Sequence, residues 1–319
     1  MAPSERVLVT GGAGFIGSHL VEALVNGGSR VVVFDDLSTG FTRNLARVQG
    51  AADLVEGDLR DLATLRRVMQ GTGTVFHLAA VSAVAPSIAD PLACNAINVG
   101  GTLHVLHAAR EAGVRRVVLT SSAAVYGADP TLPKVETMST SPLSPYAASK
   151  RAGEDFAHAF SHVYGMETVA LRLFNVYGPR QNPESEDSGV ITRFLVRLTA
   201  GEAPLVDGDG QQSRDFIFVS DVVAAFLRAA ATPGVSGEIF NIGSGRSTTI
   251  SELAATLTSI MLPDSSLRPI HRAERVGDIR HSRADISKAA DLLRFKPAVG
   301  LAEGLASTAA WWRRSATTS

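Results

Sequence analysis

Short apolar runs alternate with amphipathic stretches through the first half of the chain. The apolar runs, rich in valine, leucine and phenylalanine, lie at Arg6–Thr10, Arg30–Phe34, Asp53–Glu56, Thr74–His77, Arg116–Thr120 and Thr168–Phe174. The stretches between them have the spacing of amphipathic helices, as at Phe15–Asn26, Asp61–Gln70 and Asn98–Ala112. Apolar strands that alternate with helices predict an α/β fold, a doubly wound parallel sheet covered by helices on both faces.

This alternation changes after about Pro179. Polar loops are expected at Gln181–Gly189, Asp207–Gly210 and Pro263–Pro269, and helices at Val190–Ala200, Ser220–Ala231, Ile250–Met261 and Asp285–Leu293. We therefore expect a sheet domain over residues 1–179 and a smaller C-terminal α/β lobe over residues 180–319, crossed by the chain more than once. Open α/β sheets bind ligands at the carboxyl ends of their strands, so the lobe should close over that edge.

The composition limits the classes of partner that the chain is expected to bind. Of the 319 residues 45% are hydrophobic, and 31 acidic residues nearly balance 30 basic ones. This balance gives no general attraction to nucleic acid or to an anionic membrane. The single Cys94 excludes an intrachain disulfide and a multi-cysteine metal site, and no metal is expected. The first apolar run begins almost at the initiator methionine, and no apolar stretch has the length of a membrane span, so we expect a cytoplasmic protein.

A glycine-rich turn follows the first apolar run and opens the first helix. In Thr10-Gly-Gly-Ala-Gly-Phe-Ile-Gly17, the glycines Gly11, Gly14 and Gly17 have the spacing GxxGxxG. Such a turn lets the backbone approach a pyrophosphate, and the helix N-terminus supplies N–H donors and a partial positive charge. Alone the run could be an ordinary tight turn, but its place between strand and helix favours a dinucleotide site of the Rossmann kind.

An acidic pair ends the second apolar run. Asp35 can bind both hydroxyls of a ribose and would repel a 2′-phosphate, and no basic residue follows Asp36 until Arg43. The sequence therefore predicts NAD rather than NADP as the cofactor. Further along, Asp58 is either an adenine contact or a helix cap, and His77 is expected to be a packed strand-end residue rather than a catalyst.

A tyrosine and a lysine lie four residues apart in Tyr146-Ala-Ala-Ser-Lys150 and share one face of a helix. Tyrosine ordinarily titrates at about 10 and is a poor base at neutral pH. A neighbouring ammonium and the positive charge of oxidised nicotinamide would stabilise the phenolate and lower the pKa. Tyr146 is therefore predicted to remove a hydroxyl proton while a hydride leaves the same carbon.

The fifth apolar run ends in Leu119-Thr-Ser-Ser-Ala-Ala-Val-Tyr-Gly127. This run sharpens the prediction, because the YxxxK spacing alone is common by chance. Ser122 is expected to hydrogen-bond the same substrate oxygen as Tyr146. For Ser121 we expect only capping of the backbone at the strand end, a role that we do not expect for Ser122.

Eight motifs follow one another along the chain: TGGAGFIG, FDDLSTG, GDLRD, HLAA, NxxGT, TSSAAVYG, YAASK and LRLFNVYGPR. With them the chain resembles the extended short-chain dehydrogenase/reductases, and among these the nucleotide-sugar 4-epimerases related to UDP-glucose 4-epimerase. The resemblance runs from Arg6 to about Pro297. It implies a Rossmann-fold domain with tightly held NAD, a C-terminal nucleotide-sugar lobe, and commonly a homodimer packed through two helices of each subunit.

The resemblance also assigns roles to individual residues. Ser122, Tyr146 and Lys150 would be the catalytic trio. The cofactor would be bound by Gly11, Gly14, Phe15, Ile16, Gly17, Asp35, Asp36, Thr39, Gly40, Asp58, Leu59, Leu78, Ala79, Ala80, Asn98, Tyr146, Lys150 and Phe174. The substrate would be bound by Ser82, Ser122, Tyr146, Asn175, Arg214, Arg275, Asp278 and Ser282. The planar guanidinium groups of the two arginines suit the diphosphate, and Asp278 would bind the ribose.

Three reactions of such enzymes share oxidation at C4 of the sugar. The 4,6-dehydratases carry an Asp-Glu pair after the threonine of the fifth strand, and the decarboxylases typically carry a Ser-Glu pair. Ser121 and Ser122 stand there in this chain, which favours epimerisation through a transient 4-keto sugar. A net oxidoreductase that releases NADH remains an alternative, and so does a non-catalytic NAD-binding regulator, although regulators usually lose the tyrosine or the lysine.

The identity of the sugar depends on weaker signals. Ser282 stands where some relatives carry a bulky tyrosine, which leaves room for an N-acetyl group and admits UDP-N-acetylglucosamine beside UDP-glucose. It can equally be an ordinary loop residue. The hydroxyl groups of residues 120–122 could receive a C6 carboxylate, so UDP-glucuronate stays open.

Overall fold

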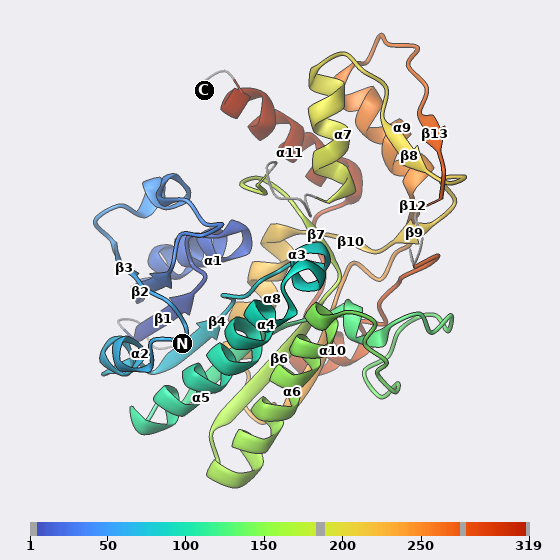
Figure 1. Ribbon diagram of the computed structural model, residues 1–319. Helices are drawn as coiled ribbons and strands as arrows, with labels where there is room; N and C mark the ends of the chain where they lie inside the picture. Colours follow the sequence, from blue (N-terminus) through green and yellow to red (C-terminus); the bar gives the residue numbers. More distant parts are fainter. Residues whose placement is uncertain (1–4, 183–188, 275–278, 317–319) are drawn as a thin grey trace.

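The computed structural model describes residues 5–182, 189–274 and 279–316. Its central sheet has seven parallel strands in the order β11-β6-β5-β4-β1-β2-β3 (Figure 1). They are β1 (Arg6–Thr10), β2 (Arg30–Asp35), β3 (Ala52–Glu56), β4 (Thr74–His77), β5 (Arg116–Ser122), β6 (Glu167–Leu173) and β11 (Glu238–Ile242). All six expected strands are present, and the order reverses between β1 and β4 as in a doubly wound Rossmann sheet. The predicted fold class is confirmed.

Helices cover both faces of this sheet. They are α1 (Phe15–Asn26) and α8 (Val219–Ala231) on one face, and α2 (Leu62–Met69), α5 (Gly101–Glu111) and α6 (Pro145–Tyr164) on the other. Successive residues of β1 enter opposite cores: Val7 and Val9 pack toward α1, and Leu8 packs toward α2 and α5. This double burial explains why the strands are nearly continuous apolar runs rather than alternating ones.

The chain crosses from the sheet to the lobe and back. After residue 179 it builds part of the lobe, returns to the sheet as α8 and β11, and enters the lobe again after residue 242. The strand β11 was not predicted, since Glu238 begins it and the fully buried polar Asn241 interrupts its apolar residues. Residues 219–242 therefore belong structurally with the first half of the chain.

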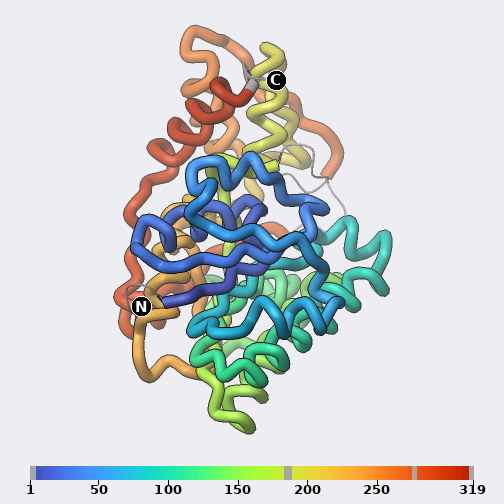
Figure 2. Tube along the Cα trace, turned by 90° about the vertical axis from the view of Figure 1, so that its left-hand side faces the viewer, coloured from blue at the N-terminus to red at the C-terminus, as the bar shows by residue number. Residues whose placement is uncertain are grey.

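A second set of elements forms the lobe, which lies at one end of the molecule in both views (Figures 1 and 2). Its helices are α7 (Val190–Thr199), α9 (Ile250–Met261) and α11 (Leu301–Ala316), which share one apolar core. Its short strand pairs are β7 (Asn175–Tyr177) with β10 (Phe216–Phe218), β9 (Ser213–Arg214) with β12 (Thr248–Thr249), and β8 (Leu205–Asp207) with β13 (Ile270–Arg272).

The remaining elements are short. They are α3 (Val84–Ala89), α4 (Pro91–Cys94), α10 (Ser287–Leu293), 3₁₀ segments at Thr42–Val48 and Ala123–Tyr126, and a π-helical stretch at Asn95–Gly100. The helix expected from Asn98 thus begins earlier, because α4, the π-helical stretch and α5 follow one another without a break. In the part of the chain that is described, no helix has both the length and the apolar character of a membrane span.

Candidate active site

The glycine turn between β1 and α1 lies at the switch point of the sheet, beside the end of β4. Gly11 has a φ of +70°, and a Cβ added there would lie 2.6 Å from the backbone N of Ala79. A Cβ on Gly17 would lie 2.0 Å from the carbonyl oxygen of Gly11. Gly14 precedes α1, whose first turn has no side-chain cap. The close backbone packing and the uncapped helix N-terminus fit the pyrophosphate of a dinucleotide.

Asp35 ends β2 and faces this turn. Its side chain is only 6% exposed, and it accepts hydrogen bonds from the backbone N–H groups of Ala13 and Leu37, each at 2.9 Å. Burial raises the pKa of the Asp35 carboxyl, although the two hydrogen bonds oppose the shift. Each carboxylate oxygen has a second lone pair, so Asp35 can hold the glycine turn and still bind ribose hydroxyls.

The other predicted contacts of the adenosine end are placed more loosely. The exposed Asp36 accepts hydrogen bonds from Ser38, and Thr39 is exposed beside the buried Gly40. A Cβ on Gly40 would lie 3.0 Å from Asp35, which keeps this turn close to the acid. The roles of these residues toward NAD stay predictions.

Asp58 follows β3 and forms an ion pair with Arg60. The guanidinium donates to both carboxylate oxygens at 2.5 to 3.0 Å, and this contact lowers the pKa of Asp58. The alternative that Asp58 caps a helix is wrong, because Asp61 caps α2. Leu59 is buried. The adenine contact of Asp58 stays a prediction.

His77 is a packed strand-end residue, as predicted. It is 4% exposed, and burial lowers the pKa of its imidazole to about 3, so it is neutral. The hydroxyl of Thr102 donates to the carbonyl of Asn98 at 2.5 Å and can therefore only accept from Nε2 of His77, 2.9 Å away. Nδ1 then accepts from the hydroxyl of Thr10 at 2.8 Å.

The backbone after β4 lies against the glycine turn. The N–H groups of Leu78 and Ala79 donate to Oγ1 of Thr10 at 3.2 and 3.3 Å. These two residues and Ala80 are half-buried, whereas Ser82 is exposed. Small residues here leave the backbone accessible to a cofactor beside Gly11.

Asn98 connects this backbone to the catalytic helix. Its side chain accepts from the N–H of Val81 at 2.7 Å and donates to the carbonyl of Val81 and to Ser149 Oγ at 3.0 and 2.9 Å. Ser149 in turn donates to the carbonyl of Tyr146 at 2.8 Å. The structure thus gives Asn98 a clear role in positioning α6, and its contact with the cofactor stays a prediction.

Two of the predicted catalytic residues, Tyr146 and Lys150, lie on α6, and Lys150 contacts β5 near its carboxyl end, where the third, Ser122, ends the strand. Tyr146 lies in the first turn of α6, where the helix dipole favours a negative charge. Nζ of Lys150 lies 3.3 Å from the carbonyl oxygen of Thr120, to which it donates, and 5.9 Å from the ring centre of Tyr146. Burial lowers the pKa of the Lys150 ammonium to about 8. The phenol of Tyr146 and the ammonium of Lys150 are thus neighbours, and the ammonium contacts the strand that ends at Ser122.

The two serines of this strand end exchange the capping roles that were expected. Ser122 Oγ accepts from the N–H of Ala124 at 3.1 Å and caps the 3₁₀ segment that follows. Ser121 caps no backbone group and instead donates to Oε1 of Glu154 at 2.5 Å. Because Glu154 lies on α6, this contact shows that Ser121 turns toward that helix. In accepting from Ala124, Ser122 does not use its own hydrogen.

In the lobe the structure brings three predicted substrate residues together. The N–H of Asn175 donates to the carbonyl of Asp215 at 3.0 Å, and the N–H of Ser282 donates to the carbonyl of Ser213 at 3.1 Å. Arg214 lies between Ser213 and Asp215 in the chain. Segments from β7, β9 and the turn at Ser282 therefore adjoin one another. Phe174, before β7, is buried in a small apolar cluster with Val125 and Tyr126. The predicted Arg275 and Asp278 lie outside the described residues.

Sequence reasoning missed the buried Asp215. Its carboxylate accepts from the N–H groups of Ser244, Gly245 and Ala284 and from the Ser244 hydroxyl, at 2.6 to 3.0 Å. It is fully buried, and burial raises its pKa. The signal was an acid directly after Arg214 in a stretch assigned to phosphate binding. Glu154 and Arg172 behind the catalytic trio were missed as well.

Comparisons with known proteins find relatives that are similar to this chain over nearly its whole length. A UDP-glucose 4-epimerase of Mycolicibacterium smegmatis is 42% identical over 317 residues, which cover 97% of this chain and 98% of that protein. A dTDP-glucose 4,6-dehydratase of an Actinoplanes species is 37% identical over 97% of this chain and 98% of that protein.

A solved structure has nearly the same fold over the whole chain. It is a UDP-N-acetylglucosamine 4-epimerase from Methanobrevibacter ruminantium in complex with UDP-N-acetylmuramic acid, with a TM-score of 0.93 and 37% identity, and the match covers 98% of this chain and 100% of that one. The family model described as NAD dependent epimerase/dehydratase family matches residues 7–243. This chain therefore belongs to that family.

Proposed function

We propose that this chain is a UDP-sugar 4-epimerase, which inverts C4 of a UDP-bound sugar through a transient 4-keto intermediate. The observation that carries the proposal is the contact of Lys150, which lies beside Tyr146, with Thr120 near the end of β5, the strand that ends at Ser122 and has no acidic residue beside it. NAD, the cofactor of the family, supplies hydride acceptance and return when it is bound.

The residues of the chain supply the proton chemistry and the positioning. The glycine turn and Asp35 hold the dinucleotide outside β1 and β4. Tyr146 accepts the proton of the C4 hydroxyl and gives it back, since the charge of Lys150 and the N-terminus of α6 favour a phenolate. The Ser122 hydroxyl hydrogen-bonds the same sugar oxygen. Because NAD is regenerated in each cycle, no second redox partner is required.

The runner-up is a 4,6-dehydratase, a reaction named for one of the relatives. Elimination of water across C5 and C6 requires an acid and a base beside the sugar. The carboxylate that Ser121 contacts belongs to Glu154, which is 1% exposed and bound through both oxygens to Arg172. That carboxylate is not available to a sugar, which favours epimerisation.

The sugar is assigned to the glucose series. Asn175, Arg214 and Ser282 adjoin one another at the lobe side, where the diphosphate and sugar of the substrate would lie. A serine at position 282 leaves space for an N-acetyl group, so we propose both UDP-glucose and UDP-N-acetylglucosamine as substrates. UDP-glucuronate remains the alternative, because the hydroxyl groups of residues 120–122 could bind a C6 carboxylate.

The test is a panel of UDP- and dTDP-sugars with chromatography of the products and absorbance at the reduced-nicotinamide band. An epimerase yields the C4 epimer without accumulating NADH, whereas an oxidoreductase accumulates NADH and a regulator gives no product. Tyr146→Phe should still bind NAD and sugar but lose nearly all turnover, since only the proton acceptor is removed. Near wild-type turnover in that variant would contradict the assignment of Tyr146.

We also propose a homodimer packed through α5 and α6. An apolar groove of about 460 Å³ runs between these helices, with Leu103, Phe156 and Phe160 among its lining residues. Val163 and Tyr164, which also line it, are 65% and 50% exposed. Val163→Lys should shift the mass measured by light scattering from two chains to one. For localisation we propose the cytoplasm, and cell fractionation tests it.

A further inference from the structure

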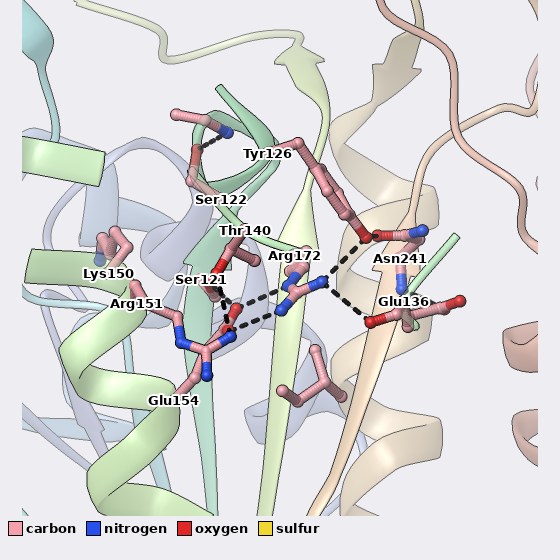
Figure 3. A network of polar contacts seen from close by, with 12 residues as sticks. Ser121, Ser122, Tyr126, Glu136, Thr140, Lys150, Arg151, Glu154, Arg172 and Asn241 are labelled. Atoms are coloured by element: carbon pink, nitrogen blue, oxygen red, sulfur yellow. Dashed lines mark hydrogen bonds and ion pairs between the residues drawn. The ribbon is translucent and has the colours of Figure 1, made fainter. Parts of the chain in front are cut away.

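A buried ion pair lies directly behind the catalytic strand end (Figure 3). Glu154 of α6 and Arg172 of β6 are each 1% exposed. Nε and Nη2 of Arg172 donate to Oε1 and Oε2 of Glu154, both at 2.8 Å, in the planar two-bond geometry of a strong pair. Removing two charges from water is unfavourable, so a buried pair by itself is weak evidence for stability. Its contacts suggest a different role.

The pair is hydrogen-bonded to side chains that lie on both sides of Ser122 along the chain. Ser121, which precedes Ser122, donates to Oε1 of Glu154 at 2.5 Å. Tyr126, which ends the 3₁₀ segment capped by Ser122, accepts from Nη1 of Arg172 at 2.9 Å. Figure 3 shows Ser122 beyond Ser121 on the strand, with Glu154 and Arg172 on the opposite side. One ion pair therefore fixes the two segments that flank the catalytic serine.

The same pair fixes the helix that carries the other two catalytic groups. Tyr146, Lys150 and Glu154 follow at intervals of four residues along one face of α6. The direct contacts of Lys150 with Thr120 of β5 are long, at 3.3 and 3.4 Å, and such bonds are weak. The short contact of Glu154 with Ser121 joins the same helix to the same strand one turn further along.

We propose that Glu154 and Arg172 are positioning residues, which hold Ser122 at the correct distance from Tyr146 and Lys150 without touching the substrate. The inference rests on the proposed function, because Ser122 and Tyr146 must reach the same C4 oxygen. Displacement of a reacting group by about one ångström lowers turnover on the order of 100-fold. Loss of the pair should therefore reduce kcat, while sugar and NAD, which contact other residues, still bind.

A second Arg–Glu pair at the other end of the same two strands provides a matched control. Arg116 and Glu167 are cross-strand neighbours at the start of β5 and β6. Arg116 is 2% exposed and donates to Glu167 at 2.9 Å. It also donates to the carbonyls of Ala229, Ala230 and Thr232. Removal of this pair disturbs the same strands far from Ser122.

The experiment compares Glu154→Leu/Arg172→Met with Arg116→Met/Glu167→Leu, both loaded with NAD and assayed below their melting temperatures. The sugar is the one that the wild type epimerises. We expect the first variant to lose kcat on the order of 100-fold with KM and bound NAD near wild type, and the second to keep its kcat. Arg172→Lys, which keeps the charge but not the two-bond geometry, should recover part of the loss.

Equal kcat values in the two double variants would overturn the inference. Absence of epimerase activity in the wild type would instead overturn the proposed function, so the two failures are distinct. Where the first double variant does not fold, Ser121→Ala and Tyr126→Phe test the same contacts, because both leave the charges paired. Each removes one hydrogen bond of the pair and should lower kcat roughly 3- to 10-fold. Unchanged kcat in both single variants would also overturn the inference.

Discussion

The sheet half and the lobe bring their functional residues together in different ways. In the sheet half, the glycine turn and Leu78 each follow a strand and Ser122 ends one, all in the same parallel sheet, so strand order alone brings them to the same edge. In the lobe, Asn175 and Ser282 come from segments more than 100 residues apart and adjoin only through backbone hydrogen bonds to residues 213–215. A repeating βα unit thus positions the proposed catalytic residues, whereas backbone hydrogen bonds between distant segments position the proposed substrate contacts.

This difference has a functional consequence. Substitutions in the sheet half should affect the turnover of every sugar, because all substrates use the same cofactor and proton acceptor. Substitutions in the lobe should change sugar binding or the choice among sugars while NAD stays bound. The two halves also meet: Tyr126 donates to Asn241 at 2.7 Å, and Asn241 donates to the carbonyl of Lys134 at 2.8 Å, which also accepts from Asp285. Because the two halves are in contact, only variants that affect one half alone can separate their contributions to turnover and to sugar binding.

The largest effect is expected from Gly17→Ala in the sheet half. The added Cβ would lie 2.0 Å from the carbonyl oxygen of Gly11, a backbone atom that cannot move without opening the turn. NAD binding, measured by titration of the purified protein, should be lost, and with it the turnover of every sugar. Gly300→Ala is the control, since a Cβ there meets no atom within 4 Å. Full NAD binding by the Gly17 variant would show that the turn does not hold the dinucleotide.

A smaller effect is expected from Asp215→Asn in the lobe. Asparagine has only one acceptor oxygen, so backbone N–H groups among Ser244, Gly245 and Ala284 lose their partner. A lost bond to a charged group of about 2 kcal/mol corresponds to roughly 30-fold. We expect KM for the UDP-sugar to rise by about that factor while the affinity for NAD is unchanged. If NAD affinity falls and KM does not, Asp215 supports the sheet half instead.

The pH dependence of turnover tests the sheet half without changing its shape. Lys150, with a pKa of about 8, is charged below that pH and loses its proton above it. Because the charge supports the Tyr146 phenolate, turnover of the wild type should fall as the pH rises through about 8, by about tenfold for each further unit. Lys150→Arg keeps the charge throughout, so its lower activity should lack this alkaline decline. A decline that is the same in the variant would assign it to another group.

The sequence predicted the parts that depend on local pattern. The six apolar runs, the glycine turn and the serine, tyrosine and lysine of the trio lie where their motifs place them. The strand β11 escaped notice because Asn241 interrupts its pattern, and this asparagine is buried only because Tyr126 and the chain at Lys134 satisfy its side chain. Such a partner depends on tertiary contacts, which no local pattern contains.

The supporting residues behind the site escaped notice for the same reason. Glu154 and Arg172 become partners only through the register of β5 and β6, which pairs Arg172 with Ser121. A signal was nevertheless present, since Arg172 is a charged residue within an apolar run that is covered on both faces, and a buried charge requires a partner. Glu154, one helical turn after Lys150, is on the matching face of α6.

The smallest effect is expected from Ser282→Tyr in the lobe, and it tests selection among sugars alone. Ser282 is half-buried, and its N–H is bonded to the carbonyl of Ser213 beside Arg214. A tyrosine there would fill the space proposed for an N-acetyl group, so kcat/KM for UDP-N-acetylglucosamine should fall about tenfold relative to UDP-glucose. Ser282→Ala leaves that space open and should keep the wild-type ratio. An equal loss on both sugars would mean that the side chain at position 282 lies near the part of the substrate that all UDP-sugars share, so that the lobe selects the sugar elsewhere.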